Sequence, residues 1–150
     1  MTDELEVAER ALAIEHEAVY ANSVVGGVLE PGTAEAGRAL DGYEAHRARR
    51  DRLEDAVQEL GAEPAPAEPG YVLPAPVTDV SSAARLARRV EDRSTVAYAQ
   101  LVGSSVGGLR AVAVDWLTDA ATRGLSWGAA PTAFPGLAAS SGAKRGSTGP

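Results

Sequence analysis

Four ionisable residues fall on helical faces that should otherwise be apolar. Glu15 lies on the inward face of a first predicted helix, His46 and Arg50 on that of a second, and Glu91 on that of a third. In a helical bundle, such residues meet at one height. Two carboxylates and an imidazole placed together can bind a metal ion, or they can form a buried salt-bridge network with an arginine.

The segment Thr33–Leu60 carries two of these residues, and the rest of the chain must supply their partners. Its stripe at helical spacing comprises Leu40, Tyr43, His46, Arg50, Leu53, Val57 and Leu60. A buried cation without a partner costs roughly 3–5 kcal/mol, so we expect Arg50 to be neutralised by Glu15 and Glu91. The sequence therefore predicts a buried polar cluster of Glu15, His46, Arg50 and Glu91.

The composition predicts a single all-α domain. The 150 residues are 45% hydrophobic but only 5% aromatic, so the core must be built from alanine, valine and leucine, and alanine favours helix. The net charge of −7 argues against a nucleic-acid-binding or anionic-membrane-binding surface. The chain has no cysteine, which excludes disulfides and thiolate metal ligands.

Capping residues and glycine or proline breaks divide the chain into four predicted helices. The first runs from Thr2 or Asp3, is loosened at Gly26–Gly27 and stops at Glu30-Pro31-Gly32. The others run from the Thr33 cap to Leu60, from an Asp79 or Ser81 cap to the GSSVGG break, and from about Val106 to Arg123. The stripe of the last helix contains Trp116, with Asp115 and Asp119 on its flank.

The two proline-containing segments are expected to lie outside the helices. Residues 62–76 include five prolines, which excludes helix and central strand and implies an extended crossover along the bundle. Tyr71, Val72 and Leu73 should hold this crossover on the surface. The WGAAPTAFPGL segment is expected to cap one end of the bundle, which gives a domain of residues 1–137 and a disordered tail of residues 138–150.

Several sequence strings resemble one protein family. They are ALAIEHEAVYANSVVGG, AHRARRDRL, LGAEPAPAEPGYVLPAPVTD and GAAPTAFPGL. Over about residues 5–137, the chain is similar to actinobacterial ferritin-like proteins known only as a domain of unknown function. The resemblance implies a ferritin-like four-helix bundle, with a long proline-rich crossover between the second and third helices and a short C-terminal cap. It implies no reaction.

Metal-binding ferritin-like bundles use one glutamate from each of two helices and a Glu-x-x-His pair from each of the other two. Glu15 and Glu91 match the single glutamates and His46 matches one histidine, but Tyr43 replaces its bridging glutamate. On the fourth helix, Asp115 is followed three residues later by a threonine instead of histidine. Two of the six ligands are missing, and Arg50 adds positive charge beside the site, so we expect no metal cofactor.

The remaining motifs indicate structure more than chemistry. His16 and Glu17 follow Glu15 directly and point in other directions, so His16 is expected at a helix boundary or on the surface. Tyr20 and Tyr98 fall near the stripes, so we expect their rings to pack in the core with a hydrogen-bond partner for each hydroxyl. No nucleophile elbow accompanies the serines, and GSSVGG lacks the lysine of a phosphate loop.

These observations favour a cytoplasmic, non-enzymatic structural or interaction module that forms a homodimer and binds neither nucleic acid nor membrane. The alternative is a divergent di-metal oxidase or iron-handling protein with iron or manganese. It would use Glu15, His46, Glu91 and Asp115 as ligands.

Overall fold

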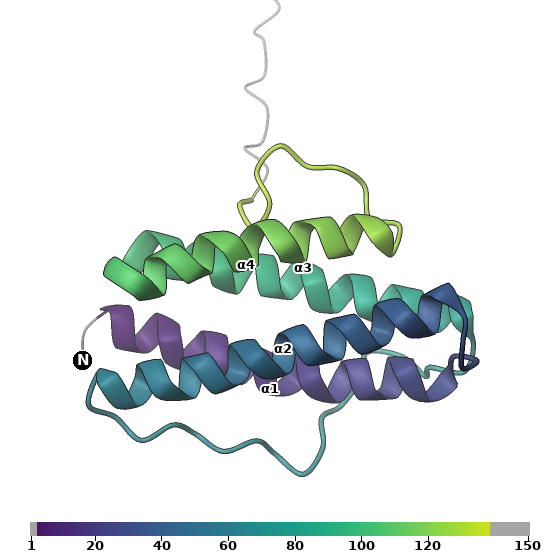
Figure 1. Ribbon diagram of the computed structural model, residues 1–150, viewed down its shortest axis with the longest axis horizontal. Helices are drawn as coiled ribbons and strands as arrows, with labels where there is room; N and C mark the ends of the chain where they lie inside the picture. Colours follow the sequence, from purple (N-terminus) through teal and green to yellow (C-terminus); the bar gives the residue numbers. More distant parts are fainter. Residues whose placement is uncertain (1–2, 139–150) are drawn as a thin grey trace, which may run out of the picture.

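The computed structural model describes residues 3–138, and this part of the chain contains four α-helices and no β-strand (Figure 1). The helices are α1 (Asp3–Val28), α2 (Ala34–Glu59), α3 (Val80–Ser104) and α4 (Gly107–Ser126). The all-α prediction is therefore confirmed for the described residues. None of these helices combines the length and the hydropathy that a membrane span requires.

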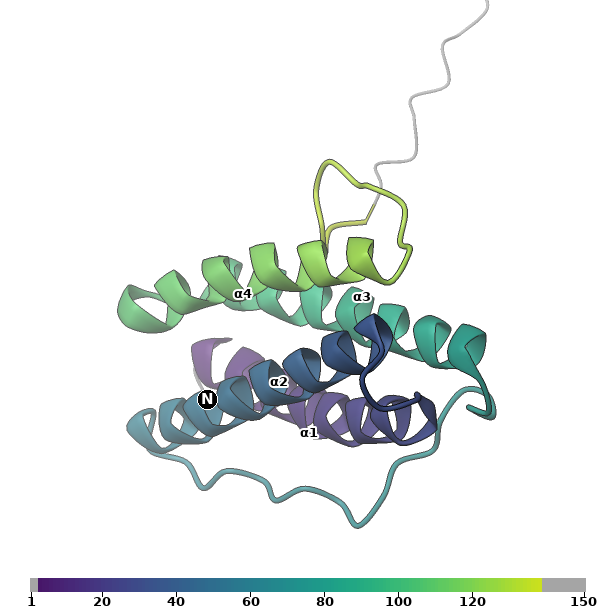
Figure 2. The same ribbon diagram turned by 45° about the vertical axis from the view of Figure 1, so that its right-hand side comes forward.

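Two helical hairpins make up the bundle. Helices α1 and α4 run in one direction and α2 and α3 in the other, as Figure 1 shows. Helix α2 packs on α1, α1 packs on α3, and α3 packs on α4. The turned view in Figure 2 separates the α1–α2 layer from the α3–α4 layer. This up-down-down-up order requires a long connection between α2 and α3.

Side-chain caps and positive-φ glycines fix the helix ends. The Thr33 hydroxyl accepts a hydrogen bond from the Ala36 backbone N–H at 3.2 Å, and Asp79 and Ser82 form a reciprocal capping box at the start of α3. Gly61, which follows the C-cap residue Leu60 of α2, has a φ of +87°, a conformation that residues with a side chain rarely adopt. The predicted caps at Thr33 and Asp79 are confirmed.

The connection between α2 and α3 runs back along the α1–α2 layer without regular structure (Figures 1 and 2). Two contacts with α1 hold it. The His16 Nε2 donates to the Ala65 carbonyl at 2.9 Å, and the rings of Tyr20 and Tyr71 lie 5.6 Å apart. The surface position predicted for His16 is therefore wrong, because the connection covers its ring and leaves it only 6% exposed.

The segment after α4 lies against the side of α3 and α4, so the predicted cap over one end of the bundle is wrong. Figure 1 shows this segment above α4. Gly136 approaches α3 so closely that a Cβ atom there would lie 2.2 Å from the Thr95 carbonyl oxygen. Apart from residue 138, the tail predicted for residues 138–150 is outside the described residues, as is a helix start at Thr2.

The interior has two apolar clusters with a polar layer between them. One cluster contains Leu12, Leu53 and Leu101, and the other contains Val25 and Leu86. The midpoints of α1, α2 and α3 fall between these clusters and place Glu15, His46 and Glu91 there. The three ionisable side chains are buried, which makes their pairing the main question about this fold.

Candidate functional site

The centre of the polar layer is an imidazole held between two carboxylates. His46 Nδ1 lies 2.7 Å from Glu15 Oε2, and His46 Nε2 lies 3.3 Å from Glu91 Oε1. Each residue comes from a different helix, so the contact joins α1, α2 and α3. His46 and Glu15 have no exposed surface, and Glu91 is 2% exposed. The structure therefore places these three side chains in direct contact.

Tyr98 and Arg49 extend this contact toward the fourth helix. The Tyr98 hydroxyl donates to the second oxygen of Glu15 and accepts from Arg49 Nη1 at 3.2 Å. The Arg49 guanidinium also lies over the Tyr98 ring, 5.4 Å from its centroid. A second guanidinium nitrogen of Arg49 donates to Asp119 on α4. This ion pair joins α2 in one layer to α4 in the other.

Arg123 completes the network at its outer end. Its Nε donates to Asp119 Oδ2 at 2.7 Å, one turn along α4. The connected groups are then three carboxylates, Glu15, Glu91 and Asp119, and three basic side chains, His46, Arg49 and Arg123. With His46 protonated, the charges of the network sum to zero, and we refer to these six residues with Tyr98 as the core network.

The environment of His46 favours the protonated ring. Burial lowers the pKa of His46, but the charge of Glu15 and the hydrogen bonds to Glu15 and Glu91 outweigh burial and raise that pKa from 6.5 to about 9. The imidazole is therefore a cation at neutral pH, and both of its nitrogens donate hydrogen bonds. No lone pair remains on the ring to accept a proton or to bind a metal.

The neighbouring pKa shifts agree with this charge assignment. Burial, and then the charge of Glu15, raise the pKa of the Tyr98 phenol well above its usual value of 10, so the hydroxyl stays protonated and donates. Burial alone would raise the pKa of Asp119. The hydrogen bond from Arg123 and the charge of Arg49 outweigh burial, so the pKa of Asp119 is lower than its usual value. Asp119 is therefore a carboxylate and Tyr98 a neutral phenol.

The prediction that Arg50 is the buried arginine is wrong, because its neighbour Arg49 occupies that position. Arg50 has a 25% exposed side chain that pairs with Asp51, whereas the Arg49 side chain is 6% exposed. The buried positions Ala39, Gly42, His46, Arg49, Leu53 and Ala56 alternate steps of three and four residues. This period places Arg49 inward and turns Arg50 about 100° away from the interior.

The predicted buried stripe of α2 is also one residue out of register before His46. The larger side chains of Leu40 and Tyr43 suggested the buried face, but Leu40 is 57% exposed. Gly42 is buried instead, and a Cβ atom there would lie 3.0 Å from Asn22 Oδ1. A residue larger than glycine here would require the Asn22 side chain to shift. The sequence signal for this face is the alternating three- and four-residue spacing from Ala39 to Ala56, which includes small residues at both ends.

Comparisons with known proteins show the family. A model described as "Domain of unknown function (DUF4439)" matches residues 8–139. The chain belongs to the DUF4439 family. The DUF4439 domain is also similar to a crystal structure of a conserved hypothetical protein from Mycobacterium tuberculosis, with a TM-score of 0.78 and 29% identity over 83% of this chain and 94% of that one. No curated protein matches the chain.

The residues of this DUF4439 domain do not fit a di-metal centre. Asp115, which was expected to complete the alternative ligand set, is exposed, and Asp119 on the next turn enters the network instead. Among residues 3–138, no group of three or more histidine and acidic side chains is arranged to hold a metal ion. The protonated His46 lies between Glu15 and Glu91, and Arg49, which is hydrogen-bonded to Tyr98, adds a second positive charge near Glu15.

Three buried polar atoms of the DUF4439 domain have no hydrogen-bond partner among the described protein atoms: His16 Nδ1, under the connection, and two atoms beside the core network. The two atoms beside the core network are the second carboxylate oxygen of Glu91 and the hydroxyl of Ser94, which lie one turn apart on α3. Buried polar atoms of this kind normally bind an ordered water molecule. The Glu91 end of the network is therefore less completely hydrogen-bonded than the Glu15 end.

Proposed function

We propose that this DUF4439 domain is a metal-free, ferritin-like four-helix bundle that acts as a structural or interaction module. The up-down-down-up order of helices and the long connection between α2 and α3 support the ferritin-like assignment. In that assignment, the core network stands at the height where related metalloproteins hold their ions. The function of the network is then to fix the helices against one another.

One observation carries this proposal: both ring nitrogens of His46 are hydrogen-bonded to carboxylates in the bundle centre. A carboxylate metal site in this bundle would need Glu15 and Glu91 as ligands. Here the protonated imidazole bridges the same two carboxylates and supplies positive charge to both. A divalent ion would have to displace a bound proton and overcome the nearby charge of Arg49.

The burial of the network supports a non-enzymatic role. A substrate would need to touch Glu15, His46 or Glu91, and none of these side chains is more than 2% exposed. The exposed end of the network, at Asp119, is paired with two arginines. Such paired and buried groups are more typical of structural ion networks than of a general acid and base.

Metal analysis of protein purified without chelator tests the proposal. We expect substoichiometric iron and manganese, unchanged when Glu15 is replaced by Gln. About one equivalent or more per chain, lost in both the Glu15→Gln and His46→Gln variants, would contradict the proposal. That result would favour the alternative of a divergent di-metal oxidase or iron-handling protein.

We also propose that the interaction partner of this module is a second copy of the chain. Exposed apolar side chains gather on α3, α4 and the segment that follows them, namely Val96, Leu125, Phe134 and Leu137. Burial of these side chains in a symmetric dimer would remove apolar area from water. Light scattering at micromolar concentration should give the mass of a dimer, and the mass of a monomer would contradict this proposal.

A further inference from the structure

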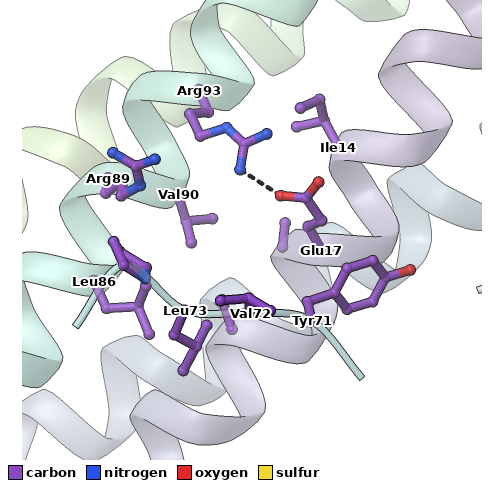
Figure 3. A pocket seen from close by; sticks show the side chains of 12 residues that line it. Ile14, Glu17, Tyr71, Val72, Leu73, Leu86, Arg89, Val90 and Arg93 are labelled. Carbon is purple, nitrogen blue, oxygen red and sulfur yellow. Dashed lines mark hydrogen bonds and ion pairs between the residues drawn. The ribbon is translucent and has the colours of Figure 1, made fainter. Parts of the chain in front are cut away.

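A small apolar pocket lies between α1, α3 and the connection from α2 to α3. Figure 3 shows its three walls: α1 with Ile14 and Glu17, α3 with Leu86 and Val90, and the connection at Leu73. The pocket has a volume of about 160 Å³. It involves no residue of the core network, so it is a separate feature of the molecule.

Small side chains on α1 leave this space open. Ala18 and Ala21 line the pocket floor, where larger side chains would fill it. The connection spans the gap because its own contacts hold it in place, through the Tyr20–Tyr71 ring pair and the hydrogen bond from His16. The walls therefore do not need to collapse onto one another, and the pocket is preformed.

The charges at the pocket rim are unbalanced. Arg93 and Glu17 face each other across the mouth and form an ion pair (Figure 3). Arg89, one turn earlier on α3, also lines the pocket and has no hydrogen-bond or ion-pair partner among residues 3–138. The rim thus carries one unpaired positive charge in a protein with a net charge of −7.

An exposed valine adds an apolar lip. Val72 lines the pocket and is 100% exposed, whereas its neighbours Tyr71 and Leu73 are partly buried. The mouth therefore combines a fully exposed aliphatic side chain with an unpaired guanidinium. A ligand with an apolar body and one anionic group would complement both.

We propose that this pocket binds a small monocarboxylate whose apolar part is about the size of one aromatic ring. The ring would lie among Ala18, Leu86 and Val90, and the carboxylate would accept hydrogen bonds from Arg89. This site goes beyond the proposed structural role, since it shares no residue with the core network.

The size of the pocket decides the ligand class. An apolar cavity of about 150 Å³ is large enough for benzene, and typical sites for drug-sized ligands begin at about 300 Å³. A volume of about 160 Å³ therefore admits one ring or one branched chain. A long acyl chain or an extended peptide would leave most of its surface outside.

Titration with phenylacetate, followed by amide NMR shifts, tests the site in the wild-type chain. Phenylacetamide is the matched neutral ligand. We expect saturable millimolar binding of phenylacetate with shifts at the pocket residues, and binding of phenylacetamide several-fold weaker. Arg89→Gln should remove this preference for the anion, while Arg110→Gln, the same charge change on an exposed position of α4, should retain it.

Ala18→Leu tests the pocket itself, because it fills the floor with a larger apolar side chain. If this variant gives a folded spectrum, we expect saturable binding of phenylacetate to be lost. If it does not fold, Ala21→Val provides the smaller change, and binding should weaken several-fold. Absence of saturable binding to the wild type, equal binding of both ligands, or binding unaffected by a filled pocket would each overturn the proposal.

Discussion

The polar layer and the two apolar clusters stabilise the same bundle by different physical means. The apolar clusters bury alanine, valine and leucine, which gain free energy from burial in almost any arrangement of similar volume. The core network gains only when each donor meets its acceptor, because an unpaired buried charge costs several kcal/mol (about 3–5). We infer that the clusters supply most of the stability and that the network specifies which helix faces meet.

The adjacent residues Arg49 and Arg50 give this contrast in its sharpest form. They have the same side chain on the same helix, but Arg49 joins Tyr98 and Asp119 in the interior and Arg50 pairs with Asp51 near the surface. Exposed ion pairs of the second kind contribute roughly 0–1 kcal/mol. Comparing the stability effects of substitutions at the two positions therefore separates the effect of burial and pairing from the effect of charge.

The largest effect is expected for Arg49→Met. This variant keeps the apolar stem but leaves Glu15 and Glu91 with His46 as their only cation in the interior. We expect the free energy of unfolding to fall by about 4 kcal/mol. Arg50→Met is the matched control and should change it by less than about 1 kcal/mol. Urea denaturation measures both, and equal effects would contradict the contrast between the two positions.

Leu53→Ala probes an apolar cluster, one turn along α2 from Arg49. Leu53 is fully buried, so we expect a loss of about 3 kcal/mol from the removed methyl groups and the remaining cavity. The loss should be the same at neutral and alkaline pH, because no ionisable group of the core network is removed. A loss that changes with pH would show that the clusters and the network are coupled.

The pH dependence of stability isolates His46. Its pKa in the folded protein is about 9, above the unfolded value of 6.5. Protonation of His46 therefore stabilises the folded state by about 3 kcal/mol. This contribution is fully present below pH 6.5 and is lost as the pH rises through about 9. In His46→Gln, this part of the pH dependence should disappear. If wild type and variant lose stability in parallel between these pH values, His46 is not the group responsible.

The smallest effect is expected for Glu91→Gln. Glu91 accepts one hydrogen bond from His46 at 3.3 Å, and its other oxygen has no partner among the described protein atoms. We expect a loss of about 1 kcal/mol, smaller than that of Glu15→Gln, because Glu15 accepts from both His46 and Tyr98. Glu44→Gln, at an exposed position of α2, should have no measurable effect. Equal losses for Glu15→Gln and Glu91→Gln would contradict the proposed asymmetry.

The helix boundaries and the inward positions of Glu15, His46 and Glu91 could be predicted because they depend on local rules. Capping residues fixed Thr33 and Asp79, and helical spacing placed Glu15, His46 and Glu91 inward. These signals need only a few neighbouring residues. The sequence alone was therefore sufficient for them.

The partners of Glu15, His46 and Glu91 depend on which of two neighbouring residues faces inward and on where the helices lie relative to one another. From His46, both Arg49 and Arg50 lie within one turn, and Arg49 is the one that shares a face with the buried residues Gly42 and Leu53. Likewise, Asp115 and Asp119 share one flank of α4, and the position of α4 relative to α2 selects Asp119. The relative position of two helices, unlike the periodicity within one helix, cannot be predicted from a local sequence pattern.

The protonation state of His46 tests the account most directly. Nitrogen-15 NMR of the imidazole side chains would measure it, with a His16→Gln variant to leave a single histidine signal. We expect both ring nitrogens of His46 to be protonated at neutral pH and to titrate with a pKa of about 9. A neutral ring at neutral pH, titrating at 6.5 or below, would contradict the charge-balanced core network.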